Sequence, residues 1–321
     1  MSYSAGGTIQ ANDYNNLAWG GNTTNTYSGT IKNLAIVMGT GIGIRGYGQS
    51  VSAIAAVEAA GTVTATQWAG LVHTLNKALG HQSGSGTQLA SGSNIGITAG
   101  ATIAAFANVA TGVSTIYDNA NLAATNGSTV TGTTFTQSIT GGAGTFTQIT
   151  TRTITFASGD AARYFFNAGG KLNWVCSATN NNSTLRSADL VTSWGTNQTG
   201  GTILGSGAVP RTGTGGTQSS NVTTQGYWAS STTAAVVSQI ASNNYRYEYN
   251  QDHTNVRIAT NGVQGASGDV GSIVYLTFGT RKTTVFEGQN DLVDVTLSTR
   301  VDVVLPETTF LANTWGVIGV T

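Results

Sequence analysis

Apolar side chains in the first third of the chain recur at the spacing of an α-helix. Steps of three and four residues place five of them on one face of the segment 64–79: Trp68, Leu71, Val72, Leu75 and Leu79. Thr64 and Gln67 stand at the capping-box spacing, in which each side chain bonds the backbone of the other. Gly80 favours a helix end, and Tyr14 and Leu17 indicate a shorter helix upstream. We therefore expect a small helical module over residues 1–84.

A second helical pattern runs through residues 103–117, where the polar positions are Ala, Thr and Asn. Its apolar positions include Ile103, Phe106, Val113 and Ile116. Asp118 is the sole charge between Lys77 and Arg152. A helix with so little outer charge is either buried in its own domain or associates with copies of itself. We expect residues 85–134 to form a low-charge helical neck or linker that associates with its copies.

Beyond residue 135 the apolar period changes to two, which is typical of strands. The alternation is seen in residues 154–156, 172–178, 245–249, 273–278 and 293–297. Short helices are expected over 158–167 and 183–194, and the stretch 195–221 has so few apolar residues that we expect an exposed loop. The fold class is thus α+β. The helical module and neck precede a C-terminal antiparallel β-sandwich-like domain over residues 135–321.

The charge balance favours assembly over binding to charged partners. Lys plus Arg number 13, Asp plus Glu number 13, and charged residues make up 8% of the 321 residues. A net charge of zero removes the electrostatic repulsion between copies of the protein, and a surface of Thr, Ser, Asn and Gly is easily desolvated. Both features favour permanent protein–protein contacts. The Lys and Arg residues are scattered along the chain and form no basic stripe, which argues against binding to nucleic acid. No apolar run is long enough to insert into a membrane, and no signal peptide is evident, so we expect the chain to stay in the cytoplasm where it is made.

Gly41, Gly43 and Gly46 match the glycines of a dinucleotide fingerprint and follow the strand-like run 33–38. A dinucleotide-binding unit also needs a second strand and an acidic residue about twenty residues beyond the glycines. Glu58 comes too early. We interpret the glycines as a turn in which backbone packs closely, and expect no cofactor.

The sequence carries no pattern of metal ligands or of a catalytic nucleophile. His73, His81 and His253 are scattered, and no HExxH, CxxC or EF-hand spacing occurs. No GxSxG elbow is present. Cys176, the sole cysteine, alternates with apolar residues, so its sulfur should point inward. We expect no metal, no catalytic residue and no enzymatic activity.

Two sets of residues leave a carbohydrate function open. A carboxylate pair for glycan cleavage could come from Asp291, Asp294, Asp302 and Glu307, although acidic residues near strand ends more often protect sheet edges. Aromatic residues beside predicted loops could stack on sugar rings of a host surface. These surface-binding candidates are Trp194, Tyr227, Trp228, Tyr245 and Tyr247.

Four segments resemble virion structural proteins of tailed phages, notably those that infect cyanobacteria. The segments are residues 9–17, 38–49, 63–82 and 154–170. The first three are similar to the N-terminal part of these proteins, and the fourth is similar to a segment that recurs in the same group. Their order along the chain is also the same.

The resemblance implies a structural component of the virion, assembled in the host cytoplasm and associated with the tail or baseplate. A short tail fibre, a spike or an adaptor fits best, because the chain lacks a long repetitive shaft. Its helices would dock to other virion proteins, its β-domain would project, and the helix 103–117 would fit the neck of a homotrimer. The assembly candidates are Tyr14, Leu17, Trp68, Ile103, Phe106, Val113 and Ile116. A capsid decoration protein, a glycan-binding or glycan-cleaving module and, more weakly, a bacterial surface adhesin are the alternatives.

Overall fold

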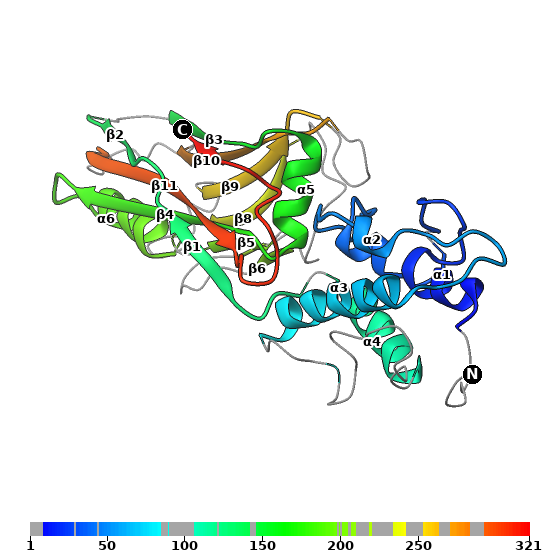
Figure 1. The fold of residues 1–321 in the computed structure, drawn as a ribbon. Helices are drawn as coiled ribbons and strands as arrows, with labels where there is room; N and C mark the ends of the chain where they lie inside the picture. The colour runs from blue at the N-terminus through cyan, green and yellow to red at the C-terminus, as the bar shows by residue number, and fades with distance from the viewer. Residues whose placement is uncertain are drawn as a thin grey trace.

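The chain folds into a helical lobe and a β-rich lobe that lie side by side (Figure 1). The structure is a computed structural model. It describes residues 9–28, 30–43, 45–84, 89, 106–120, 122–141, 146–197, 199, 201–204, 207–209, 218–219, 234–241, 253–262, 270–282 and 292–321. The α+β class expected from the sequence is confirmed.

The helical lobe is built around α3, which begins as the sequence predicts. Its elements are α1 (Ala11–Trp19), α2 (Leu34–Met38), a 3-10 turn (Ser52–Ile54), α3 (Ala65–Ser83) and α4 (Phe106–Asp118). Thr64 and Gln67 form the predicted capping box. The predicted end at Gly80 is wrong, because α3 continues to Gly84, which adopts the left-handed φ of 79°. Gly80 lies inside the helix, where a Cβ would come within 2.7 Å of the Phe310 ring.

Helix α2 occupies the run 33–38, whose pattern suggested a strand. Asn33 caps it, because its Oδ1 accepts a hydrogen bond from the Ile36 N–H at 3.0 Å. All five residues of α2 are buried. A short apolar run that is buried on every side has no periodicity that separates helix from strand.

Helix α4 packs against α3 and α2 of the same chain, so its apolar face is covered within the helical lobe. Val113 and Ile116 are fully buried there, and the Phe106 ring stacks on Trp68 with the ring centroids 6.3 Å apart. Of the two readings of this uncharged helix, burial in its own domain is the one observed. Val113 and Ile116 are therefore not available to a neck, and the bounds 85–134 stay a prediction. Ile103 lies outside the described residues.

The β-rich lobe contains two antiparallel sheets. The first has the order β1-β11-β4-β5-β6, with β2 also pairing with β11, and the second has the order β12-β3-β10-β9-β8-β7. Their strands are β1 (Asn126–Val130), β2 (Phe135–Ile139), β3 (Phe146–Thr155), β4 (Lys171–Asn180), β5 (Gly201–Leu204), β6 (Gly207–Val209), β7 (Gln218–Ser219), β8 (Ala235–Ala241), β9 (His253–Thr260), β10 (Ile273–Lys282), β11 (Val295–Pro306) and β12 (Gly319–Val320). A face-to-face sandwich of the two sheets stays a prediction.

Two boundaries differ from the sequence-based expectation. Strand β1 pairs with β11, so the β-rich lobe begins before residue 135. Strands β5 and β6 lie within the stretch 195–221 that was expected to be a loop, and β5 pairs with β4. An added strand is held by main-chain hydrogen bonds, which leave no apolar signature in the sequence.

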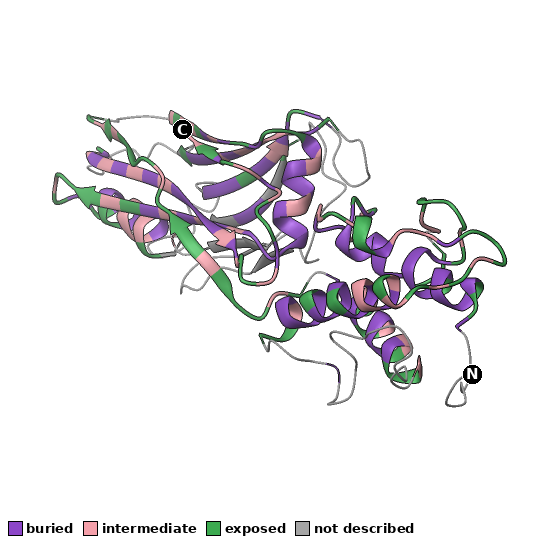
Figure 2. Cartoon of the chain, viewed as in Figure 1, coloured by how far each residue is buried: buried purple, intermediate pink, exposed green. Residues whose placement is uncertain are grey.

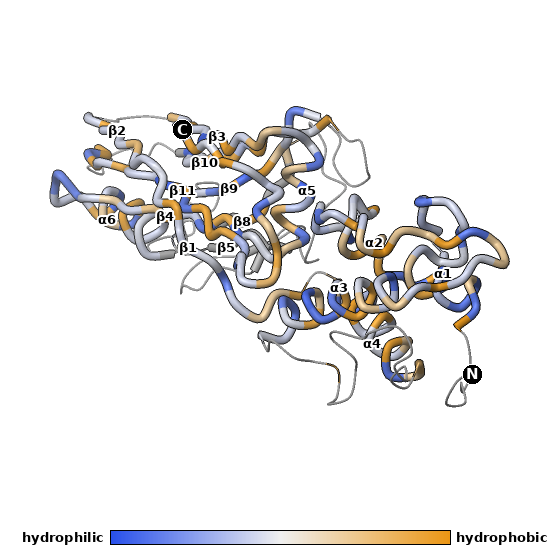
Figure 3. Tube along the Cα trace, viewed as in Figure 1, coloured by the Kyte–Doolittle hydropathy of each residue, from blue (hydrophilic) through white to orange (hydrophobic). Residues whose placement is uncertain are grey.

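Alternating side chains of the central strands form the core of the β-rich lobe. In β4, Leu172, Trp174 and Cys176 are buried, and the facing positions of β11 are buried as well. Figure 3 shows the hydrophobic positions gathered along these two strands. Figure 2 shows β11 largely buried, whereas β1 at the sheet edge is largely exposed.

Helix α5 (Gly159–Asn167) closes the end of the β-rich lobe that faces the helical lobe (Figure 1). The predicted helix over 158–167 is confirmed, and Ser158 caps it by accepting from the Ala161 N–H at 3.0 Å. Phe165 and Phe166 pack against Phe156. Helix α6 (Leu185–Val191) and a π-helical turn (Thr192–Asn197) cover the segment 183–194, as predicted.

Candidate functional site

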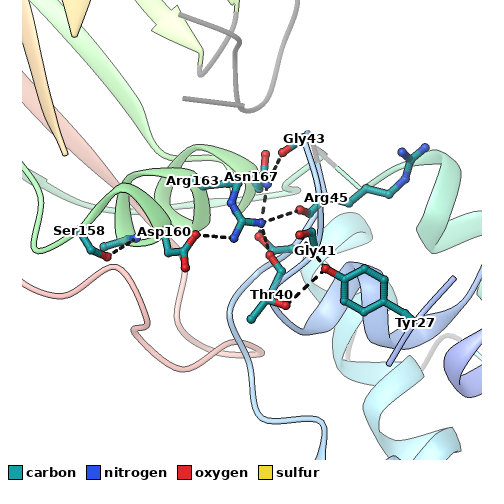
Figure 4. A network of polar contacts seen from close by, with 11 residues as sticks. Tyr27, Thr40, Gly41, Gly43, Arg45, Ser158, Asp160, Arg163 and Asn167 are labelled. Atoms are coloured by element: carbon teal, nitrogen blue, oxygen red, sulfur yellow. Dashed lines mark hydrogen bonds and ion pairs between the residues drawn. The ribbon is translucent and has the colours of Figure 1, made fainter. Parts of the chain in front are cut away.

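The polar contacts between α5 and the loop 40–46 join the two lobes (Figure 4). Arg163 is fully buried, and its guanidinium donates to the carbonyl oxygens of Thr40 and Arg45. Its Nη2 also donates to Asp160 at 2.8 Å. One turn further along α5, the Asn167 side-chain amide donates to the carbonyl oxygen of Gly43 at 3.0 Å. We call this set of contacts, with the further contacts of Asn167, the lobe joint.

The glycines of the loop 40–46 make this geometry possible. Gly41 has a φ of 60°, and a Cβ there would lie 2.1 Å from the Arg45 carbonyl oxygen. Gly46 has a φ of 112°, and a Cβ there would lie 2.4 Å from the Thr40 carbonyl oxygen. Only glycine combines a positive φ with such close backbone approach. The interpretation of these glycines as a tightly packed turn is confirmed.

The loop 40–46 presents acceptors to its neighbour. The carbonyl oxygens of Thr40, Gly43, Arg45 and Gly46 all receive hydrogen bonds from α5. A phosphate-binding loop does the opposite, because it offers backbone N–H groups to an anion. The loop therefore serves as a socket for the cation of Arg163.

His81 and Gln49 extend the contact between the lobes. The His81 Nε2–H of α3 donates to the Ala168 carbonyl oxygen at 3.1 Å, and burial lowers the pKa of His81 to about 4. Gln49 bonds the backbone of Ala312 in both directions, at 3.0 and 2.8 Å. Thr314 donates to the Tyr47 carbonyl oxygen at 2.7 Å. The segment after β11 is thus tied to the helical lobe as well.

The described assembly candidates lie in the interior of the helical lobe. Trp68, Val113 and Ile116 are at most 1% exposed, Tyr14 and Leu17 are buried in α1, and Phe106 is half-buried against Trp68. The buried side chains stabilise the lobe and are not exposed for docking, so their prediction as interface residues is wrong. For the half-buried Phe106 it stays a prediction.

Trp194 is the surface-binding candidate that the structure describes, and it is buried. Trp194 is only 2% exposed, and its indole Nε1 donates to the Ser298 carbonyl oxygen at 3.1 Å. Trp194 is therefore a core residue, and its prediction as a surface residue is wrong. The other candidates lie outside the described residues: Tyr227, Trp228, Tyr245 and Tyr247.

Each described carboxylate of the glycan-cleavage candidates interacts with a different partner. Asp302 pairs with Arg300 at 2.8 Å, Glu307 accepts from Thr309, and Asp294 accepts from Asn181 at 3.2 Å. Asp294 and Asp302 are about 26 Å apart at the rise of an extended strand, far beyond the 5 to 10 Å or so of a glycosidase pair. Asp291 lies outside the described residues.

The remaining reactive groups are also separated. His73 is exposed on α3, and Cys176 is buried in β4, which raises the pKa of its thiol and confirms that its sulfur points inward. Within the described ranges, no three His, Cys, Asp or Glu residues form a group that could hold a metal ion. None of the described helices meets the length and hydropathy of a membrane span.

Two sheet edges of the β-rich lobe carry exposed apolar side chains. Strands β1 and β2 lie end to end along β11, with a register shift between Asn126 and Thr129. Val130, Phe135 and, on β3, Ile149 are 40%, 39% and 59% exposed. Such edges carry unpaired backbone groups and are the usual sites of pairing between chains.

The residues that hold the lobe joint were not predicted individually. Arg163 and Asn167 bond backbone carbonyl groups that lie more than a hundred residues away, which no local pattern reveals. The usable signal was a single cation inside an apolar helix, since an arginine among buried positions requires partners. Comparison with known proteins adds nothing further: no family model, no curated protein and no solved structure matches the chain.

Proposed function

We propose that the chain is a non-enzymatic structural component of a tailed-phage virion, of the short tail fibre, spike or baseplate-adaptor kind. One observation carries this proposal. The segments 38–49 and 154–170, which resemble virion proteins, meet each other in the lobe joint although they lie far apart in the sequence. The segment 63–82 joins them through His81.

The lobe joint suits a protein that holds its neighbours in an assembly at fixed relative positions. A buried guanidinium with several acceptors fixes the angle between two elements, because its planar fork bonds in defined directions. The two lobes then form one rigid body that docks at one end and projects at the other. Docking uses the exposed surface of the helical lobe, where Ile31 is 44% exposed.

The proposal leaves out a threefold neck. Its basis was the apolar face of the helix 103–117, and α3 covers the described part of that face. Self-association through the β-rich lobe is compatible with the proposal, because that lobe carries the exposed edges.

The test is the protein content of the phage particle. Particles are purified by density gradient from a phage that encodes the chain, analysed by mass spectrometry, and labelled with antibody and gold for electron microscopy. We expect the chain in every particle in several copies, with the label on the tail or baseplate. Label on the capsid would indicate a decoration protein, and absence of the chain from the particle would overturn the proposal.

A sugar-release assay separates the proposal from the carbohydrate alternative. The purified chain is incubated with host surface polysaccharide, and reducing ends are measured over time. We expect no release above that of heat-denatured chain. Release that Asp294→Asn or Asp291→Asn abolishes would contradict a non-enzymatic role.

A further inference from the structure

Among the described residues, the outer edge of β3 is unpaired over most of its length. On one side β3 pairs with β10 over ten consecutive residues without a register shift. On the other side β12 covers only Ile154 and Thr155, and Thr321 bonds Thr153. Among the described strands, none pairs with the outer side of residues 146–152.

The direction of the free backbone groups follows from Thr153. Its N–H donates to the Thr321 carbonyl oxygen and its carbonyl oxygen accepts from the Thr321 N–H, at 2.9 and 3.0 Å. In an antiparallel ladder every second residue points its N–H and C=O to the same side. Thr147, Ile149 and Thr151 therefore direct their backbone groups outward, and their side chains are exposed.

This edge lacks the features that normally prevent pairing. Natural edges are protected by charges, proline, bulges or very short strands, whereas residues 119–151 contain no charge and no proline. The Ile149 side chain is 59% exposed on the regular part of the strand. The nearest cation, Arg152, is turned inward, where its guanidinium donates to the Thr133 carbonyl oxygen and lies over the Phe135 ring.

We propose that a second copy of the chain pairs with this edge, β3 against β3, in antiparallel orientation about a twofold axis at Ile149. The proposal rests on the proposed function, in which the chain acts by assembly, and names the partner of this edge. The pairing places Ile149 opposite its own counterpart and Thr147 opposite Thr151 of the second copy. It joins the second sheets of two copies into one continuous sheet.

The symmetry and the lack of charge of the unpaired residues indicate a second copy of the chain as the partner. Residues 146–152 are centred on Ile149, whose backbone groups point outward, so two identical edges match in register. The partner strand begins at Phe146, opposite Arg152, and therefore ends before Thr321, which occupies the place beside Thr153. Residues 146–151 of the strand itself offer no charge to a charged partner, whereas a twofold pairing of these residues brings no like charges together.

The first test is the solution mass of the purified chain, measured by light scattering after size exclusion from 1 to 100 µM. We expect a dimer of twice the 32.7 kDa subunit mass. Ile149→Lys should weaken the dimer at least 100-fold, since it places two ammonium groups opposite each other. The matched control is Leu185→Lys on α6, because Leu185 is similarly exposed at 53% and its variant should remain dimeric.

Two further variants keep the test decisive if Ile149→Lys fails to fold. Mixing Ile149→Lys with Ile149→Glu should restore a dimer, because opposite charges then meet at the axis. Ile149→Cys should form a disulfide-linked dimer under oxidising conditions, since directly opposed Cα atoms lie about 5.5 Å apart. Leu185→Cys should not, and the native Cys176 is buried.

Several outcomes would overturn the pairing. These are a monomer at 100 µM, a trimer, a dimer that Ile149→Lys leaves intact, and failure of Ile149→Cys to crosslink. A monomeric chain that is nevertheless present in purified particles would overturn the pairing and leave the virion role standing. A dimer that is absent from particles would overturn the virion role and leave the pairing standing.

Discussion

Arg163 is a buried cation that its surroundings satisfy by hydrogen bonds. Moving an unpaired guanidinium out of water would cost several kcal/mol, but here two backbone carbonyl groups and the Asp160 carboxylate receive it. The partners belong to both lobes, so the side chain stabilises the fold and the joint at once. Its removal leaves carbonyl groups of the loop 40–46 without donors.

Arg163→Met should lower the free energy of unfolding by about 3 kcal/mol, because buried acceptors that lose their partners cost 1 to 3 kcal/mol or so each. Urea denaturation followed by circular dichroism measures the change. Arg257→Met is the matched control, since Arg257 is exposed on β9 and its loss should cost less than about 0.5 kcal/mol. Equal stabilities of the two variants would show that the joint contributes nothing.

His81 makes stability depend on pH in a defined window. Burial lowers its pKa to about 4, whereas the unfolded chain has the ordinary value of about 6.5. Between these values the unfolded state binds more protons, so the free energy of unfolding falls as the pH drops from 6.5 towards 4. The loss reaches about 3 kcal/mol once the pH has fallen to the folded-state pKa of about 4.

Urea denaturation at pH 7 and pH 4.5 tests this prediction. His81→Gln should flatten the dependence on pH in this window, and His73→Gln should not, because His73 is exposed. A parent protein that is equally stable at both pH values would contradict the neutral, buried state of His81.

At the scale of the element, sequence reasoning succeeded where the signal is local. The capping box of α3 and the serine cap of α5 each involve residues within four positions of one another in the sequence. Both helices begin where predicted. It failed where the deciding contact is distant. Gly80 lies inside α3 with the Phe310 ring packed against it, and β5 pairs with the edge of β4. For the candidate site, the tight glycine turn was predicted, but its partner α5 was not.

The loop 40–46 provides a test in which conformation and space can be separated. Gly41 and Gly141 have nearly the same φ, 60° and 64°, but a Cβ on Gly141 meets nothing within 4 Å. Gly141→Ala should therefore cost only the 1 to 2 kcal/mol or so of the left-handed conformation. Gly41→Ala should cost at least about 4 kcal/mol, since its Cβ overlaps the Arg45 carbonyl group. Equal losses in thermal denaturation would mean that the loop relaxes freely.

At the scale of the whole molecule, the contacts of Arg163, His81 and Gln49 predict that the lobes unfold together. Native-state hydrogen exchange measures the opening free energy of amides in α3 and in β11. We expect the most protected amides of both elements to report the same value, as in a single cooperative unit. In Arg163→Met the two values should diverge. A lower value for α3 in the parent chain would mean that the helical lobe opens alone.

Strand β11 has a consequence for how the chain reaches this fold during synthesis. It lies between β4 on one side and β1 and β2 on the other, and all three leave the ribosome well before it. Until residue 306 has been made, these earlier strands have no neighbour between them. Because such distant pairings form slowly, β1, β2 and the edge of β4 that faces β11 stay unpaired in this interval, whereas β3, β9 and β10 can already pair with one another. The uncharged strands are therefore most prone to aggregation in this interval, and slower translation before residue 295 should lower the yield of soluble protein.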